Sequence, residues 1–237
     1  MKRSILTYIL WAAIILVITM MVFFNYIPKD KTAQSNIPLA PSILSGDTRA
    51  PFIPPDDKLT LSPSSSLLPL HVSESKALVL YDQGLKLYYQ RQFPEALVFF
   101  NQALAIDVQC YEALNAKGAT LAFQGRYDQG LALIQHALDL NPLFVYGYFN
   151  RGLANELAGR WDQAITAYPK ALQLDERDTW SYYGIASIYG RLGNVDKVLE
   201  YLKPAITLDP DVKAVARDEQ DFNPVSKDER FQTLVKP

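Results

Sequence analysis

The sequence predicts an all-helical protein in which antiparallel helix pairs stack into a right-handed superhelical solenoid. Two observations carry this prediction. Small and apolar residues recur every 34 positions between residues 77 and 212. Single breaker residues interrupt each period near its middle, as expected where one helix turns into the next. Two further segments precede the repeats, an uncharged stretch at residues 5–27 and a Pro- and Ser-rich stretch at residues 28–74.

The uncharged stretch is long enough to cross a bilayer, because about 20 apolar residues in a helix span the hydrocarbon core. A cleaved signal peptide is the alternative. Its apolar region is usually shorter and ends at small residues, whereas here Phe24, Asn25 and Tyr26 run towards Pro28. We therefore expect residues 1–27 to be an uncleaved transmembrane anchor, with the membrane contact at residues 5–27.

The orientation of this anchor follows weakly from its flanks. Lys2 and Arg3 precede the span, and Lys29 and Lys31 follow it, so the cationic side chains balance. The amino terminus and Asp30 tilt the balance towards a cytoplasmic amino terminus. Both placements of the repeats, inside or outside the cytoplasm, remain open at this point.

We expect residues 28–74 to be a disordered linker. Eight prolines and a run of serines at Ser64, Ser65 and Ser66 leave little apolar area to offset the entropy of ordering. As a flexible coil this segment would reach roughly 40 Å on average. Two short apolar pairs, Ile43 with Leu44 and Leu67 with Leu68, could dock onto the repeats. Tethering the repeats to the predicted anchor is the simpler role for this segment.

The 34-residue period shows in several columns of the sequence. Small residues occupy the positions where two helices must approach closely: Gly84, Gly118, Gly152 and Ala186, and again Ala103, Ala137, Ala171 and Ala205. Apolar residues recur after each turn at Phe93, Tyr127, Trp161 and Val195. The turns themselves fall at Arg91, Gly125, Gly159 and Gly193.

This pattern resembles the tetratricopeptide repeat (TPR), whose period and helix–turn–helix signature it shares. The resemblance implies four units at residues 77–110, 111–144, 145–178 and 179–212. Pro142 and Pro210 close two units as in the family, while Val108 and Glu176 replace that proline in the others. Pro169 and Pro204 fall inside second helices, where a kink or a shortened helix is expected.

Residues 213–237 look like the closing helix of bacterial repeat proteins of this type. A solenoid leaves an apolar face on its last unit, which such a segment covers. We expect Phe222, Phe231 and Leu234 to be its buried anchors.

Composition argues against several function classes. A net charge of −2 and a pI near 5.7 give no basic footprint for nucleic acid. His71 and His136 lie too far apart in register for a metal pair, and the single cysteine, Cys110, falls in a turn between units. We therefore expect neither an enzyme nor a small-molecule, metal or cofactor site.

The TPR resemblance implies that a partner protein lies against the first helices, on the concave surface. In the family, five positions of each unit make most of the contacts with such partners. The residues that we select at these positions are Leu78, Tyr81, Leu85, Tyr88, Glu112, Asn115, Tyr146, Phe149, Glu156, Trp180, Tyr183 and Arg191. These aromatics favour an apolar or amphipathic segment as partner. Some of them will instead pack between helices. Some members of the family bind the carboxylate at the end of a partner chain. Such a site is disfavoured here, because only Asn150, among the residues at the corresponding positions, is suited to it.

We therefore predict a single-pass membrane protein whose repeats recruit a protein partner, most plausibly while a membrane complex is assembled. The architecture resembles that of photosystem I assembly factors, which combine one span with a few repeats. Two alternatives stay open: an envelope scaffold for secretion, pilus or wall machinery, and a permanent structural subunit of a large complex.

Overall fold

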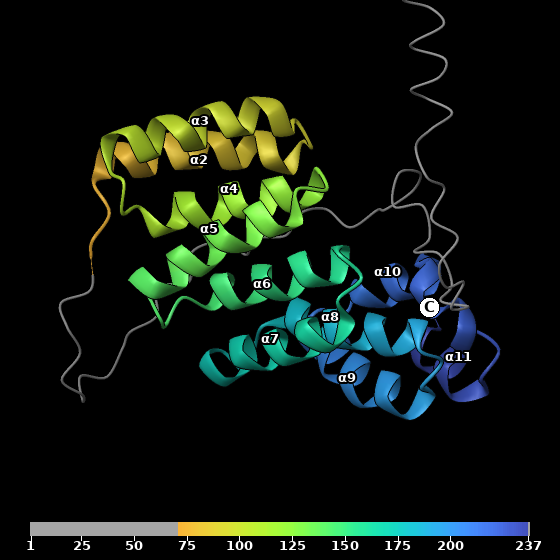
Figure 1. The fold of residues 1–237 in the computed structure, drawn as a ribbon. Coiled ribbons are helices and arrows are strands. Elements are labelled where there is room, and N and C mark those ends of the chain that lie inside the picture. Colours follow the sequence, from red (N-terminus) through yellow and green to blue (C-terminus); the bar gives the residue numbers. More distant parts are fainter. Residues whose placement is uncertain (1–70, 237) are drawn as a thin grey trace, which may run out of the picture. The chain divides into compact units, whose positions relative to one another are not determined.

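The computed structural model describes residues 71–236. Over this range the chain is helical and contains no strand, which confirms the all-helical prediction for the described part. The helix pairs follow one another in chain order (Figure 1). Their bounds are α2 Ser75–Tyr89 and α3 Phe93–Ile106, α4 Tyr111–Phe123 and α5 Tyr127–Leu140, α6 Val145–Leu157 and α7 Trp161–Leu174, and α8 Thr179–Arg191 and α9 Val195–Leu208.

The helices pack in a repeating order. Helices α3, α5 and α7 each contact the first helix of their own unit and that of the next unit, and α4 also contacts α2 and α6 directly. Helix α6 contacts α8 in the same way. We call the side formed by α2, α4, α6 and α8 the inner face, and the side formed by α3, α5, α7 and α9 the outer face.

Helices α4 and α5 approach each other closely at two glycines. A Cβ atom built on Gly130 would stand 2.5 Å from the carbonyl oxygen of Gly118, and one built on Gly118 would stand 2.6 Å from the carbonyl oxygen of Gly130. Neither backbone can accept a side chain at such a distance. The small-residue column of the sequence therefore marks a backbone contact in this unit.

The turns within the pairs use a left-handed residue at one register position. Gly125, Gly159 and Gly193 have φ values of 78°, 71° and 69°. Arg91 holds the same position in the first unit with φ 60°, although it carries a side chain. Such a backbone is costly for residues other than glycine. The Arg91 guanidinium lies 5.8 Å from the ring centre of Phe93, and this contact offsets part of the cost.

The two internal prolines do not shorten their helices. Helices α7 and α9 contain Pro169 and Pro204, and both run for 14 residues, as α3 and α5 do. Of the two expected effects, the shortening is therefore wrong, and the kink stays a prediction. Proline removes one backbone hydrogen bond from a helix, but packing of the surrounding turns stabilises the remainder.

The C-terminal segment closes the last helix pair. It forms α10 Val212–Asp218, the 3₁₀ helix η1 Gln220–Val225 and α11 Glu229–Val235. Phe222 and Phe231 are buried with stacked rings 5.4 Å apart, and Phe222 also meets Tyr183 at 5.8 Å. Leu234 is half-buried against the same cluster. These residues cover the end of the fourth unit with apolar contact.

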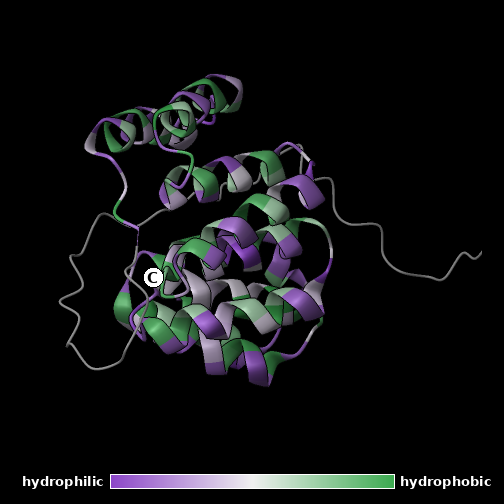
Figure 2. Ribbon diagram, turned by 60° about the vertical axis from the view of Figure 1, so that its left-hand side comes forward, coloured by the Kyte–Doolittle hydropathy of each residue, from purple (hydrophilic) through white to green (hydrophobic). Residues whose placement is uncertain are grey.

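Apolar and polar residues are interspersed along the helices (Figure 2). None of the helices in residues 71–236 combines the length and apolar character needed to cross a membrane. The predicted anchor at residues 5–27 and most of the predicted linker lie outside the described residues.

Candidate functional site: the inner face of the repeats

All the residues that the sequence assigned to partner binding lie on first helices, but they differ in exposure. The half-buried ones are Leu78, Tyr81, Leu85, Glu112, Tyr146, Trp180 and Arg191. The buried ones are Tyr88, Asn115, Phe149, Glu156 and Tyr183. Only the half-buried residues offer surface to a partner without rearrangement of the core.

The buried aromatics belong to the packing between helices. Phe149 meets Tyr168 of α7 with ring centres 5.8 Å apart, and Tyr183 meets Phe222. Tyr88 lies against Phe93 and Phe123. Burial raises the pKa of Tyr88 above its ordinary range, and the neighbouring Tyr89 raises it further, while Arg91 acts in the opposite direction. These side chains hold helix pairs together.

One register position is half-buried in every unit. It is the second residue of the unit, at the start of each first helix, and is occupied by Leu78, Glu112, Tyr146 and Trp180. Successive first helices contact one another, so these residues form a row across the inner face. The rings of Tyr146 and Trp180 pack on one side against Phe144 and Tyr183, at 5.8 and 5.5 Å. Neighbouring rings thus fix their orientation.

Several buried amides on these helices have unmet hydrogen-bonding capacity within the protein, among them Asn115 and Asn150. Asn115 Oδ1 has no hydrogen-bond partner, and neither does Oδ1 or Nδ2 of Asn150. Both side chains are at most 2% exposed. Buried amides without partners cost roughly 1–3 kcal/mol.

A buried ionic cluster links the third unit, the fourth unit and the C-terminal segment. Glu156 Oε2 accepts a hydrogen bond from Tyr168 Oη at 2.6 Å, and Oε1 accepts one from Ser187 Oγ at 3.0 Å. Arg191 Nη2 lies 3.3 Å from Glu156 Oε1. The same guanidinium binds Asp221 of η1 through two contacts of 2.7 Å.

Two residues of the predicted groove, Glu156 and Arg191, make contacts within the protein in this cluster. Glu156 is 3% exposed, and Arg191 is directed into contact with two carboxylates. Asp221 stands out in the sequence only as part of an acidic turn. The signal that could have linked them is the single charged residue, Glu156, at a position where other units carry Tyr88, Ala122 and Gly190. A charge in a core column needs a buried counter-charge.

Cys110 and His136 differ in exposure. Cys110 is fully buried just before α4, and its Sγ donates to Glu112 Oε2 at 3.5 Å. Burial raises the pKa of the Cys110 thiol to about 11, and the charge of Glu112 adds to this effect. His136 lies exposed on α5. Among the residues described, no group of three or more His, Cys, Asp or Glu side chains is placed to hold a metal ion.

Comparisons with known proteins agree with this geometry. A family profile described as a TPR repeat matches residues 157–193, and one described as a tetratricopeptide repeat matches residues 181–212. The comparison with curated proteins found no significant match.

Solved structures share the fold. A thermophilic TPR protein, TTC0263 from Thermus thermophilus, is 20% identical with a TM-score of 0.57, over 67% of this chain and 86% of that one. A MamA RS-1 double mutant is 19% identical with a TM-score of 0.53, over 69% and 94% of the two chains. A second MamA structure has 19% identity and a TM-score of 0.51, over 67% and 85%. Residues 157–212 thus match tetratricopeptide-repeat profiles, and they continue the 34-residue register of the two units before them.

Proposed function

We propose that this protein recruits a protein partner through the inner face of its repeats, and that residues 5–27 anchor it in a membrane. Tetratricopeptide repeats are modules of protein–protein interaction, and four stacked helix pairs offer an extended surface for one. The observation that carries the proposal is the row of half-buried residues at the second position of each unit. Two of them, Tyr146 and Trp180, are aromatic.

The chemistry of this row favours an apolar or amphipathic segment as the partner. Tyrosine and tryptophan supply large contact areas at little cost in side-chain entropy, and they dominate many binding surfaces.

The membrane part of the proposal rests on the sequence. Residues 5–27 carry no charge over 23 positions, and the Pro- and Ser-rich segment that follows would let the repeats search a zone near the bilayer. A role in assembling a membrane complex fits a tethered recruiting module. An envelope scaffold or a permanent subunit would use the same inner face, and a protease-accessibility assay on sealed membranes separates the scaffold from the assembly role.

Site-specific photocrosslinking in native membranes tests the binding face. A photoreactive residue at Tyr146 or Trp180 should capture one defined subunit of a membrane complex. The same residue placed at Gln102, exposed on α3 of the outer face, serves as the control and should not capture it. Capture of the same protein from both faces, or of none from the inner face, would refute the proposal.

Surface variants complete this test. Tyr81→Ser and Tyr146→Ser alter half-buried side chains and should reduce capture at Trp180. Phe149→Ala and Tyr183→Ala are unsuitable, since both rings are core residues whose truncation costs about 3–5 kcal/mol of stability. Capture at substoichiometric levels favours an assembly factor, whereas fixed stoichiometry favours a permanent subunit.

A further inference from the structure

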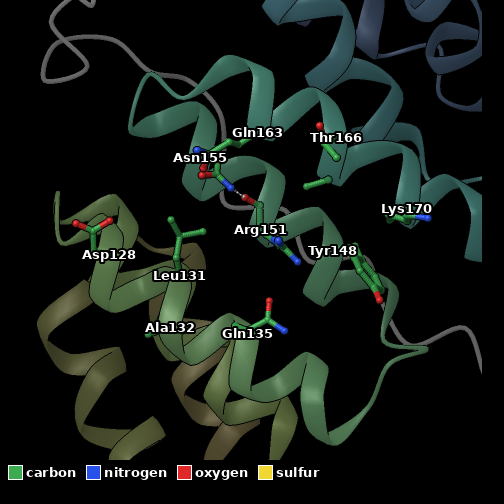
Figure 3. A pocket seen from close by; sticks show the side chains of 11 residues that line it. Asp128, Leu131, Ala132, Gln135, Tyr148, Arg151, Asn155, Gln163, Thr166 and Lys170 are labelled. Atoms are coloured by element: carbon green, nitrogen blue, oxygen red, sulfur yellow. Dashed lines mark hydrogen bonds between the residues drawn. The ribbon is translucent and has the colours of Figure 1, made fainter.

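The outer face carries a pocket of about 850 Å³ that the inner-face proposal does not use. It lies between α5 and α7, with α6 as its floor. Figure 3 shows Gln135 on one wall, Thr166 and Lys170 on the other, and Arg151 between them. Tyr148 and Asn155 stand on the same helix as Arg151. The pocket is thus on the side of the helix pairs opposite to the row at Tyr146 and Trp180.

This pocket exists because one repeat column changes size in the third unit. The residues at that register position are Phe99, Leu133, Ala167 and Tyr201. A second column changes polarity in the same unit and reads Leu87, Leu121, Asn155 and Tyr189. In the fourth unit Tyr189 and Tyr201 stack with ring centres 6.1 Å apart and occupy the corresponding space. The third unit has Asn155 and Ala167 there instead.

Asn155 brings an unmet hydrogen bond to this pocket. The side chain is 3% exposed, and its Nδ2 donates to the carbonyl oxygen of Arg151 at 2.8 Å. Its Oδ1 has no hydrogen-bond partner within the protein. A buried acceptor in this state is costly, so a ligand that presents an N–H group to the pocket floor would be favoured.

The charge of the lining is positive. Asp128 is the acidic residue of the lining, and Arg160 neutralises it through a contact of 2.7 Å. Lys170 contacts the neutral Gln173 at 3.1 Å, and Arg151 extends into the open part of the pocket. Two cations therefore line the pocket, and its acidic residue is already paired. Such an arrangement attracts negatively charged groups.

We propose that this outer-face pocket is a second binding site, which takes an acidic peptide segment of a partner protein. Carboxylates of the segment pair with Arg151 and Lys170, and one of its backbone N–H groups donates to Asn155 Oδ1. A simple anion would satisfy the cations but offers no donor to the asparagine. Peptide backbone and acidic side chains together supply both kinds of contact. The protein would then connect one partner on the inner face with another on the outer face.

Fluorescence anisotropy with the full-length chain tests this site. The probe is a fluorescein-labelled peptide of alternating Glu and Gly, and its control has Gln in place of each Glu. We expect the acidic peptide to bind about tenfold more tightly, with affinity falling as salt is raised. Arg151→Ala and Lys170→Ala should each weaken it about threefold to tenfold. Lys203→Ala, which removes an exposed cation from α9, should leave it unchanged.

Filling the pocket gives the sharper test. Ala167→Leu places there the residue type that Leu133 provides in the second unit, so the helix pair should still fold, as circular dichroism would show. Binding of the acidic peptide should be abolished, while crosslinking from Trp180 on the inner face persists. Equal binding of the two peptides, unchanged binding by Ala167→Leu, or an equal loss with Lys203→Ala would overturn the proposal.

The segment before the repeats contains an acidic pair that could compete for the pocket, Asp56 and Asp57. The double change Asp56→Asn and Asp57→Asn in the full-length chain distinguishes the two sources. Unaltered peptide affinity supports a segment from another protein. A gain of about tenfold or more, the factor expected for the charged peptide itself, would mean that the chain fills its own pocket, and the assignment to a partner would fall.

Discussion

The Arg191 guanidinium donates two hydrogen bonds to the Asp221 carboxylate, from Nε to Oδ1 and from Nη2 to Oδ2, each 2.7 Å long. The two residues are 30 positions apart, and the pair joins α8 to the C-terminal 3₁₀ helix. Arg191 also reaches Glu156 on α6. One cation therefore compensates two buried carboxylates and couples the C-terminal segment to the last two repeat units.

Removing this cation should destabilise the C-terminal half. Arg191→Met removes the cation that the buried Glu156 and Asp221 share, and the expected loss is about 3–5 kcal/mol. Urea denaturation followed by circular dichroism and by tryptophan fluorescence measures it. Adding Asp221→Leu to Arg191→Met should restore part of the loss, because one of the two buried carboxylates disappears.

The matched control for that prediction is Lys197→Met. Lys197 forms a surface pair with Glu200 at 2.7 Å, and the two side chains are 41% and 50% exposed. Such pairs contribute about 0–1 kcal/mol. If Arg191→Met cost no more than Lys197→Met, the buried cluster would not couple the units as described.

The contact between α4 and α5 predicts an unfavourable Gly130→Ala substitution. Alanine in a helix normally gains about 0.5–1 kcal/mol over glycine. Here the new methyl group would meet the carbonyl oxygen of Gly118 at 2.5 Å, and backbone cannot rotate away as a side chain does. Overpacking of this kind costs about 1–3 kcal/mol, so the clash should outweigh the gain.

Thermal unfolding of Gly130→Ala and of Gln102→Ala provides the measurement. Gln102 is exposed on α3, and its replacement should change stability by less than about 0.5 kcal/mol. A Gly130→Ala variant that is more stable than the natural chain would show that the two helices can separate at little cost.

The contacts of Asp107 predict that the stability of the protein falls at acid pH. Its carboxylate accepts hydrogen bonds from His71 Nε2 at 2.8 Å and from the backbone N–H groups of Glu74 and Gln109 at 3.0 Å. Burial alone would raise the pKa of Asp107, but these bonds outweigh it and lower the pKa below its ordinary value. The ionised carboxylate thus fastens the segment before α2 to the turn after α3.

The sign of the acid effect follows from that depressed pKa. The stabilising contribution of the carboxylate is complete above about pH 4–5 and is lost as the pH falls through the folded-state pKa. Asp107→Asn should therefore cost about 1–2 kcal/mol at neutral pH, and the difference from the natural chain should shrink below about pH 4. Denaturation curves between roughly pH 2.5 and pH 7, the window set by the direction of the shift, measure the difference.

Asp209→Asn is a suitable comparison for this residue. Asp209 holds the same register position in the fourth unit, and its Oδ1 accepts the turn hydrogen bond from the N–H of Asp211. Asn141 makes the same turn bond in the second unit, so an amide serves equally well there. A loss at Asp209→Asn as large as that at Asp107→Asn would place the effect in the turn rather than in the contacts to His71 and Glu74.

The buried thiol of Cys110 should react slowly with disulfide reagents in the folded protein. With a pKa of about 11, only about one thiol in a thousand is ionised at pH 8, and the side chain is fully buried. Labelling should become fast and reach one thiol per chain in urea. Cys110→Ala with Val108→Cys gives the positive control, since Val108 is 70% exposed. Rapid labelling of the native chain would reopen a reactive role for Cys110.

The sequence by itself determined the helix pairs, their register and the turns between them. A period of 34 residues with apolar side chains at helical spacing is a local property, so α4, α6 and α8 begin at Tyr111, Val145 and Thr179, where the predicted units begin. The apolar anchors of the C-terminal segment could be named for the same reason. Phe222 and Phe231 are the aromatic residues of a largely polar stretch.

Only the tertiary structure decided which faces these residues occupy. Spacing places Tyr88, Phe149 and Tyr183 on the partner-facing side, but helix crossing and the covering C-terminal segment bury their rings. Glu156 and Arg191 have the spacing of groove charges, yet the fold brings Asp221, distant in sequence, beside them. The outer pocket depends on Ala167 and Asn155 meeting across two helices. Such burial and charge pairing arise from contacts between distant segments, which the periodicity of a single helix does not encode.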